Sequence, residues 1–360
     1  MTTTVWGGRG AWGKHSPAPD ILARARDLVL PAMRAAVARL DPANERIVSY
    51  HLGWTELDGS PSAAGGGKGV RPALATLSAS AAGAPPEVAV PGAVAVELVH
   101  NFSLLHDDVM DGDTQRRHRG TVWALWGTAS AILSGDALLA LATEVLLDEP
   151  TLPGGRAARL IAETTRELVR GQTEDLAFER RGDVRVDECL AMAAGKTGAL
   201  LAASASIGAV LAGAPDELVR ALHRYGTELG LAFQLVDDLL GIWGDPVRTG
   251  KPVYADLRAG KKTLPVTYAV THGGAPGDEL AAWLAAVNPT GDAGGAEETG
   301  EADVLRAAEL VEAAGGRRWA ADEARRRLAA AERALDSVPM NCTARAELRD
   351  IARFVVTREA

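Results

Sequence analysis

The chain of 360 residues has few cysteines and few aromatic residues. Its two cysteines, Cys189 and Cys342, lie far apart and lack the spacing of metal ligands. We therefore expect no disulfide framework and a reducing compartment. Aromatic residues make up 4% of the chain, alanine and leucine are abundant, and no run alternates in the manner of a strand. This composition favours helix over sheet and predicts an all-α protein.

Other features that the sequence lacks narrow the function. The formal net charge is −9, which argues against a nucleic-acid partner because phosphate contacts need a basic surface. Residues 1–17 have no apolar core of the kind found in signal peptides, and no apolar run long enough for a membrane span is free of glycine or charge. We expect a cytoplasmic protein with no membrane span, a flexible extension over 1–17, and one domain over 18–360 with a flexible loop at about 288–303.

Catalytic sets based on Ser-His-Asp, Cys-His or zinc spacing are also missing, because the seven histidines are scattered. The segment Glu97–Gly120 carries a different signal. The residues from Val94 through Leu105 are almost continuously apolar, which predicts a buried helix. Three carboxylates follow this run together. They belong to Asp107, Asp108 and Asp111.

On a helix, Asp107 and Asp111 lie one turn apart on the same face, where their charges repel each other. A divalent cation among them would relieve this repulsion, and Mg²⁺ is the natural candidate because it binds carboxylates, waters and phosphate oxygens. Arg116 and Arg117 follow closely and suit the oxygens of a diphosphate. The alternative is an ordinary helix end with surface charges.

A second apolar helix, within Gly230–Asp245, ends in Asp237 and Asp238, with Asp245 further on. Two buried helices that each end in paired carboxylates predict the facing walls of one cavity, with cations between them.

Basic residues in three other segments could contact an anion. Lys68 and Arg71 follow a run of glycines, which is either an anion cradle or a plain linker. Lys196 lies among small and apolar residues, so it is either ligand-facing or solvated. A basic loop follows the second acidic helix. It contains Lys251, Lys261 and Lys262.

Together these residues describe a site that ionises an organic diphosphate. Mg²⁺ would act as a Lewis acid on the leaving diphosphate, and arginine and lysine would hold its other oxygens. Apolar walls would keep water from the carbocation.

From about residue 20 to its end, the chain resembles the trans-isoprenyl diphosphate synthases, or polyprenyl synthetases. DDVMD matches their first aspartate-rich motif, DDxxD. GGKGVRP, GQTEDL, GKTG, FQLVDDLL and GKKTLP match further motifs of the family in the same order. The resemblance implies an all-α, single-domain bundle of the isoprenoid synthase type with a central cavity. It also implies a homodimer.

The resemblance implies roles for individual residues. The Mg²⁺ ions, three in number, would be bound by Asp107, Asp111 and Asp237, with Asp108 and Asp238 in support. Isopentenyl diphosphate would be bound by Lys68, Arg71, His100 and Arg117. The allylic diphosphate would be bound by Arg116, Lys196, Lys251 and Lys261, with Lys262 nearby. Gln172, Thr197 and Gln234 would lie near the reacting carbons. Lys196, Thr197, Gln234 and Arg116 are the implied catalytic residues.

The second motif departs from the family pattern because its third position is Gly241 instead of aspartate. Asp245 lies too far along the chain to be a simple replacement. We still expect the cation to bind, because Asp237 is the matching ligand.

Phe102, five residues before Asp107, with the small Ser103 after it, resembles the arrangement in geranylgeranyl diphosphate synthases and implies a twenty-carbon product. A farnesyl or longer-chain synthase, a terpene cyclase and a non-catalytic synthase subunit are the alternatives.

Overall fold

The computed structural model describes residues 17–62, 67, 69–148, 151–246, 253–287 and 300–356. Helices dominate these residues, as predicted, and their only strands are the short pair β1 (Gln115–Arg116) and β2 (Arg119–Gly120). The helices are α1 (Ala18–Val37), α2 (Pro42–His51), α3 (Val70–Ala81), the 3₁₀ helix η1 (Pro86–Ala89), α4 (Val90–Asp111), α5 (Val122–Trp126), α6 (Thr128–Leu147), α7 (Leu152–Arg180), α8 (Val186–Ala193), the π-helix η2 (Ala194–Gly198), α9 (Ala199–Leu211), α10 (Asp216–Trp243), α12 (Ala255–Arg258), α13 (Leu264–His272), α14 (Gly274–Val287), α15 (Glu301–Ala313), α16 (Gly316–Asp336) and α17 (Cys342–Val356).

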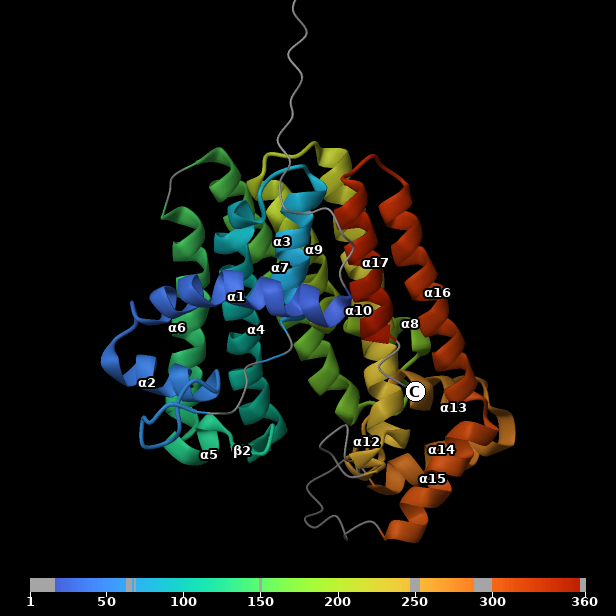
Figure 1. The fold of residues 1–360 in the computed structure, drawn as a ribbon. Coiled ribbons are helices and arrows are strands. Elements are labelled where there is room, and N and C mark those ends of the chain that lie inside the picture. The colour runs from blue at the N-terminus through green and yellow to red at the C-terminus, as the bar shows by residue number, and fades with distance from the viewer. Residues whose placement is uncertain are drawn as a thin grey trace, which may run out of the picture.

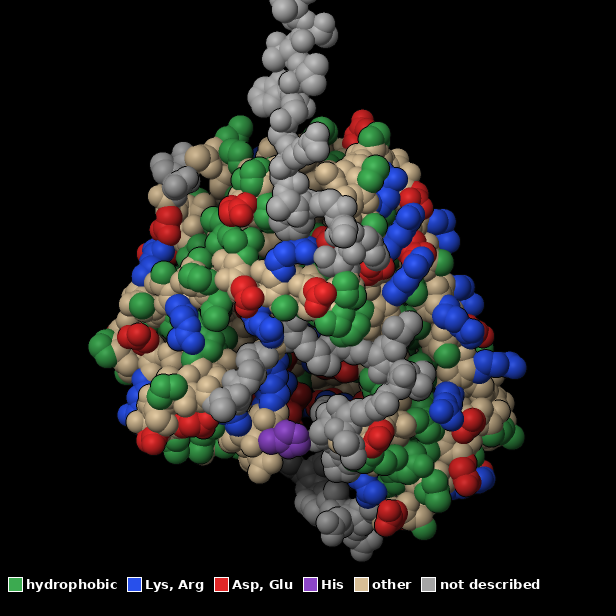
Figure 2. Space-filling view, viewed as in Figure 1, with side chains coloured by type: hydrophobic (Ala, Val, Ile, Leu, Met, Phe, Trp, Pro, Cys, Tyr) green, Lys and Arg blue, Asp and Glu red, His purple; other side chains and the backbone are tan. Residues whose placement is uncertain are grey.

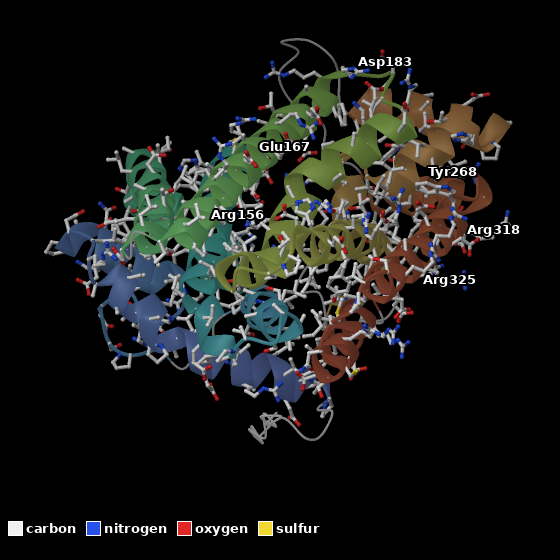
Figure 3. The ribbon with its side chains drawn as sticks, turned by 90° about the horizontal axis from the view of Figure 1, so that it is seen from above. Arg156, Glu167, Asp183, Tyr268, Arg318 and Arg325 are labelled. Atoms are coloured by element: carbon white, nitrogen blue, oxygen red, sulfur yellow. The ribbon has the colours of Figure 1, made fainter. Side chains whose placement is uncertain are left out.

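The long helices pack side by side, with α3, α4 and α9 near the centre (Figure 1). Arg156 and Glu167 of α7 lie along one edge of the bundle, and Arg318 and Arg325 of α16 lie along the opposite edge (Figure 3). Between these edges, α9 packs against α7 on one side and α10 on the other, and α10 packs against α16. The short helices α12 to α15 cover the end of the bundle at which α10 finishes.

Glycines allow unusually close contact where the bundle forms its inner cavity. A Cβ atom on Gly171 of α7 would come within 2.2 Å of the backbone nitrogen of Lys196, and one on Gly230 of α10 would come within 2.6 Å of the Cα of Gly198. Because glycine has no side chain at these two positions, η2 can lie directly against both α7 and α10. The GKTG segment is therefore held between the two long helices.

The sequence analysis predicted no helix within residues 41–66, which contain several turn-forming residues. Pro42–His51 forms α2, because the Asp41 carboxylate accepts hydrogen bonds from the amides of Ala43 and Asn44 and proline is favoured at a first helical position. The expected loop at 288–303 is also shorter at its end, since α15 begins at Glu301. Most of this loop and residues 1–16 of the expected extension lie outside the described residues.

Three helical segments are long and apolar enough to cross a membrane by length and composition alone: Pro86–Asp111, Thr128–Leu147 and Val186–Leu211. The first and third have 67% and 72% of their most apolar window buried in the protein, where it forms the core. For Thr128–Leu147 the share is 39%. The absence of a membrane span stays a prediction.

Candidate active site

The carboxyl ends of α4 and α10 contribute to the wall of one cavity of about 750 Å³. Asp111 lines it from α4, Asp237 from α10, and Lys196 and Lys261 from between them. On the outer surface, the molecule is hollowed near its centre, and acidic and basic side chains gather in this hollow (Figure 2). The two acidic motifs, 130 residues apart in sequence by the numbers of Asp107 and Asp237, thus meet at one site.

The first acidic cluster is only partly neutralised by protein groups. Nε of Arg116 donates to Oδ1 of Asp108 at 2.6 Å, whereas Oδ2 of Asp108 is buried without a hydrogen-bond partner among the described residues. Burial, reinforced by Asp111 and opposed by Lys196, raises the pKa of Asp107 to about 6. The end of α4 therefore concentrates negative charge that the protein alone does not fully balance.

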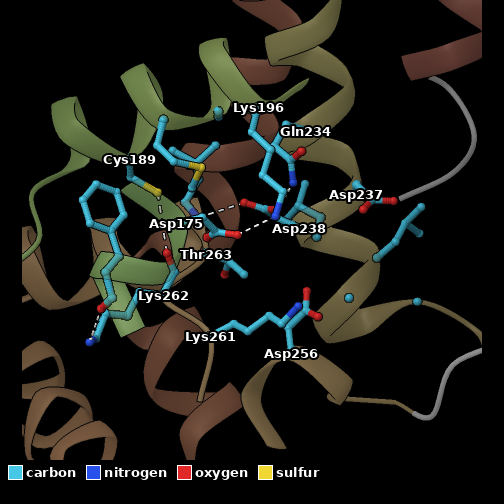
Figure 4. A pocket seen from close by; sticks show the side chains of 18 of the residues that line it. Asp175, Cys189, Lys196, Gln234, Asp237, Asp238, Asp256, Lys261, Lys262 and Thr263 are labelled. Atoms are coloured by element: carbon cyan, nitrogen blue, oxygen red, sulfur yellow. Dashed lines mark hydrogen bonds and ion pairs between the residues drawn. The ribbon is translucent and has the colours of Figure 1, made fainter. Parts of the chain in front are cut away.

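Lys196 lies within the π-helical turn η2, and its Nζ donates to Oδ2 of Asp175 at 2.5 Å (Figure 4). Burial by itself would lower the pKa of Lys196, but Asp175, Asp107 and Asp111 together raise it. Lys196 is consequently a cation held between α7 and α4. π-Helical turns are frequent at functional sites because they displace a side chain from the regular helical position.

A line of polar contacts crosses from η2 to α10 and onward to α13. The hydroxyl of Thr197 donates to Oε1 of Gln234 at 2.7 Å, and Nε2 of Gln234 donates to Oδ1 of Asp238 at 2.7 Å. Oδ2 of Asp238 accepts from the amide of Leu264 at 2.9 Å. Burial raises the pKa of Asp238 to about 8. Both oxygens of Asp238 are thus engaged in protein contacts, which makes it an anchor between helices in this structure.

Several more bases gather near His100 of α4. Arg71 at the start of α3 is partly buried beside Glu97 and Arg117, and its Nε has no hydrogen-bond partner in the described part of the chain. Burial, together with Arg71 and Arg117, holds the pKa of His100 well below its usual range. His51 of α2 borders the same region, and burial lowers its pKa to about 3.

Sequence reasoning missed His51 because it did not predict α2, and it missed Glu97 because this residue precedes the acidic motif by nearly three turns. The histidine pair and Glu97 surround arginines that are available to an anion. Both histidines stay neutral near pH 7, so they can accept or donate a hydrogen bond without adding charge.

Arg117 and His118 form the two-residue turn of the β1–β2 hairpin, with φ angles of 52° and 61°. This is the geometry of a type I′ turn, in which both central residues are left-handed. A Cβ atom on Gly67 would lie 3.5 Å from Nη2 of Arg117, so Gly67 lies beside the guanidinium. The hairpin therefore brings Arg117 next to one residue of the GGKGVRP motif, Gly67.

The other residues that the sequence predicted to lie at the substrate sites are found in different surroundings. Nζ of Lys261 lies 3.9 Å from Oδ2 of Asp111. Nζ of Lys262 instead donates to the carbonyls of Phe178, Glu179 and Arg181 at the end of α7. Gln172 is buried, and neither polar atom of its side chain has a hydrogen-bond partner among the described residues. Lys68 and Lys251 lie outside the described residues.

In the described part of the chain, no three histidine, cysteine or acidic side chains lie close enough to hold a metal ion by themselves. The donor set nevertheless fits Mg²⁺, which binds one or two carboxylates and completes its shell with waters and phosphate oxygens. The Oδ2 atom of Asp108, which is buried without a hydrogen-bond partner among the described residues, and the nearby carboxylate of Asp107 are donors of the kind that a Mg²⁺ ion would use.

Comparison with known proteins identifies the fold and the motifs. A family model described as polyprenyl synthetase matches residues 60–291. A (2E,6E)-farnesyl diphosphate synthase of Mycobacterium tuberculosis is 55% identical over 340 residues, which cover 94% of this chain and 93% of the relative. A geranylgeranyl diphosphate synthase of the same organism is 46% identical over 299 residues, or 82% of each chain. The crystal structure of a polyprenyl synthetase from Streptomyces coelicolor has a TM-score of 0.89 at 53% identity, and the match covers 94% of this chain and 100% of that one.

An all-helical bundle with two acidic helix ends and surrounding bases defines a prenyl-transferring enzyme that acts on diphosphates. The chain belongs to the polyprenyl synthetase family and is a trans-prenyltransferase. The family uses a divalent metal. The alternative interpretations as a terpene cyclase or a non-catalytic subunit have no support from these relatives.

Proposed function

We propose that the protein condenses isopentenyl diphosphate head-to-tail with an allylic diphosphate, with three Mg²⁺ ions, to give mainly geranylgeranyl diphosphate. The observation that carries this proposal is the presence of two groups of basic residues along one acidic helix. Lys196 and Lys261 adjoin Asp107 and Asp111, and Arg71 and Arg117 lie near Glu97 and His100 of the same helix. Two diphosphates need two such groups.

In this proposal, different residues bind the two diphosphates and the Mg²⁺ ions. The guanidinium groups of Arg71 and Arg117 hold the oxygens of isopentenyl diphosphate, with His100 as a neutral hydrogen-bonding partner. Lys196 holds the allylic diphosphate and is itself positioned by Asp175. Mg²⁺, when bound by Asp107, Asp111 and Asp237, neutralises the charge that develops on the departing diphosphate.

Gln234 lines the cavity, and Thr197 contacts Gln234. Their mutual hydrogen bond fixes the orientation of both side chains, because Gln234 is also bound to Asp238. Lys251 and Lys68 would add contacts to the allylic and the isopentenyl diphosphate, respectively.

The proposed chain length rests on α4. Phe102 is buried and meets the ring of His106 edge-on, with 4.8 Å between ring centroids, and Ser103 beside it is small and buried. We infer that Phe102 forms the floor of the channel for the growing chain and that Ser103 leaves room for a fourth isoprene unit. A fifteen-carbon product is the second candidate, because the relative at 55% identity is named a farnesyl diphosphate synthase.

We also propose a cytoplasmic homodimer that forms through α6. Ile132 and Leu133 of this helix are 40% and 61% exposed, and Leu147 near its end is 48% exposed. An apolar face of this kind usually marks a protein contact. A second copy of the chain would cover it.

Incubation of the purified protein with isopentenyl diphosphate, dimethylallyl diphosphate and Mg²⁺ tests the activity, and chromatography of the dephosphorylated products gives their length. We expect mainly the twenty-carbon alcohol. A fifteen-carbon product alone would establish the farnesyl alternative, and no condensation with any allylic primer would refute the proposal. Light scattering on the same sample would measure the oligomeric state.

A further inference from the structure

The β1–β2 hairpin carries Arg116 and Arg117, and a third arginine of the hairpin connects it to the rest of the protein. Arg119 belongs to none of the family motifs. It pairs with Arg116 in the register of the hairpin and follows the two-residue turn directly. Its side chain is 18% exposed, so most of this side chain is packed against other residues. Arg119 is therefore well placed to fix the position of the turn.

The guanidinium of Arg119 binds the loop that precedes the glycine-rich segment. Nη2 donates to the carbonyl of Thr55 at 2.7 Å, and Nη1 donates to Oγ of Ser62 at 3.0 Å. Oε1 of Glu56 lies 3.5 Å from the same Nη1. Arginine suits such a double contact, because its planar guanidinium presents several N–H groups in a fixed geometry. The hairpin is thereby joined to the loop at residues 54–62.

This loop is itself held by contacts at both of its ends. Thr55 and Pro61 form an isolated β-bridge, and the amide of Ser62 donates to the carbonyl of Trp54 at 3.0 Å. The guanidinium carbon of Arg34 in α1 lies 4.6 Å from the centroid of the Trp54 ring. Arg119 therefore binds a closed loop that is attached to α1.

Tyr50 of α2 supports the same strand. The guanidinium carbon of Arg119 lies 4.2 Å from the centroid of the Tyr50 ring, which is a cation–π contact. The hydroxyl of Tyr50 donates to the carbonyl of Gly120 at 3.1 Å. Its ring meets that of Trp126 in α5 edge-on, with 5.0 Å between ring centroids. Strand β2 is thus held against α2 at both of its residues.

The two arginines that precede Arg119 depend on these contacts to different degrees. Arg116 has its own anchor, because its Nε donates to Oδ1 of the buried Asp108 at 2.6 Å. Arg117 forms the turn itself, so its position follows from the backbone of the hairpin. Movement of β2 should therefore displace Arg117 more than Arg116.

We propose that Arg119 is a positioning residue for the isopentenyl diphosphate site. By joining β2 to Tyr50 and to the 54–62 loop, it holds the turn so that the guanidinium of Arg117 meets the diphosphate. This inference rests on the proposed function, since it concerns the same substrate site.

Steady-state kinetics of the full chain, with each substrate varied in turn, tests the proposal. Arg119→Gln should raise the KM for isopentenyl diphosphate by about tenfold, because a misplaced Arg117 loses part of a hydrogen bond to a charged group. The KM for the allylic diphosphate should change little, since Asp108 still holds Arg116. Arg46→Gln is the matched control, because Arg46 donates to the carbonyl of Leu57 in the same loop and not to the hairpin. It should leave both KM values unchanged.

Variants of its partners separate positioning from a direct contact with substrate, since Arg119 lines the same small cavity as Arg117. Tyr50→Phe and Ser62→Ala keep Arg119 but each remove one hydrogen bond that holds the hairpin. Both should raise the KM for isopentenyl diphosphate, to a smaller degree than Arg119→Gln. No change in these two variants beside a change in Arg119→Gln would overturn the proposal in favour of direct binding. An equal change in both KM values in Arg119→Gln would also overturn it.

Calorimetric titration with isopentenyl diphosphate compares the same variants without turnover, and thermal unfolding would verify that each retains its fold. Equal affinity in the wild type and Arg119→Gln would refute the role of Arg119 alone. A wild-type protein that binds isopentenyl diphosphate but condenses it with no allylic primer would refute the proposed function alone. A wild-type protein that does not bind it would refute both.

Discussion

The ends of α4 and α10 carry related acidic motifs, yet the two ends are held in different ways. In each pair, the second aspartate is buried and bound to protein: Asp108 to Arg116, and Asp238 to Gln234 and the amide of Leu264. The partner of Asp108 is a charged side chain from the β-hairpin, whereas the partners of Asp238 are neutral groups. In each motif, the second of the two adjacent aspartates is therefore the one that fixes the helix end.

The comparison also shows how the third position can differ. α4 contributes Asp111 from its own last turn, whereas the corresponding position on α10 is Gly241, with Asp256 against it. The two helix ends therefore present different sets of acidic side chains to the cavity.

The first prediction tests whether both ends are required. Asp107→Ala and Asp237→Ala should each lower kcat by more than about a hundredfold, which exceeds the usual effect of removing an outer-shell partner of a metal. Circular dichroism should show unchanged helix content, because neither carboxylate is the buried member of its pair. Near-normal turnover in either variant would refute its assignment as a Mg²⁺ ligand.

The second prediction separates the adjacent arginines beside α4. Arg117→Gln should raise mainly the KM for isopentenyl diphosphate, and Arg116→Gln that for the allylic diphosphate, each by about ten- to a hundredfold. A hydrogen bond to a charged group contributes on the order of 1.5–3 kcal/mol, which corresponds to this range. Steady-state kinetics with each substrate varied in turn would measure the split.

Because Arg116 also binds the buried Asp108, Arg116→Lys is the appropriate control for loss of that contact. Equal changes in both KM values for both glutamine variants would show that the two arginines serve one site.

The third prediction concerns residues upstream of the two motifs. At five and four residues before the first aspartate, α4 has Phe102 and Ser103, whereas α10 has Ala232 and Phe233. If α4 alone sets the channel floor, Phe102→Ala should lengthen the product and Ser103→Phe should shorten it to fifteen carbons. Chromatography of the dephosphorylated products would decide. Unaltered length in both variants would place the floor elsewhere.

The fourth prediction concerns the protonation of the buried carboxyl group of Asp238. Burial raises its pKa from 3.8 to about 8, so between these values the folded chain retains a proton that the unfolded chain releases. The free energy of unfolding from this group therefore decreases as the pH rises through this range. In metal-free protein, Asp238→Asn should lose less thermal stability than the wild type as the pH rises from about 4 to about 8, a difference of about a few degrees in Tm. Parallel Tm curves would show that Asp238 does not titrate there.

The sequence predicted most of the long helices because their apolar residues recur with helical spacing over many turns. It predicted neither α2, whose start depends on the cap Asp41, nor the β1–β2 hairpin, whose two left-handed residues, Arg117 and His118, have no glycine or asparagine signal. Short elements depend on a few specific contacts, which periodicity does not reveal.

The same limit applies to the site. The motifs predicted Asp111, Asp237 and Lys196 as neighbours, and the structure places them around one cavity. His51 belongs to no motif pattern that we used, and it comes near the site only because α2 places it beside Leu104 and Asp108 of α4. Long-range contacts of this kind appear only in three dimensions.

The adjacent lysines of the loop before α13 have a consequence for reading mutagenesis. Nζ of Lys262 binds the carbonyls that end α7, and its own carbonyl accepts from the thiol of Cys189 at 3.5 Å, whereas Nζ of Lys261 approaches Asp111. Lys262 thus holds the loop against the end of α7, and Lys261 lines the cavity. We expect an alanine at Lys262 to act through the position of the loop, and an alanine at Lys261 to remove a positive charge beside Asp111. Because neighbouring residues make the two contacts, the loop has little freedom to change its length.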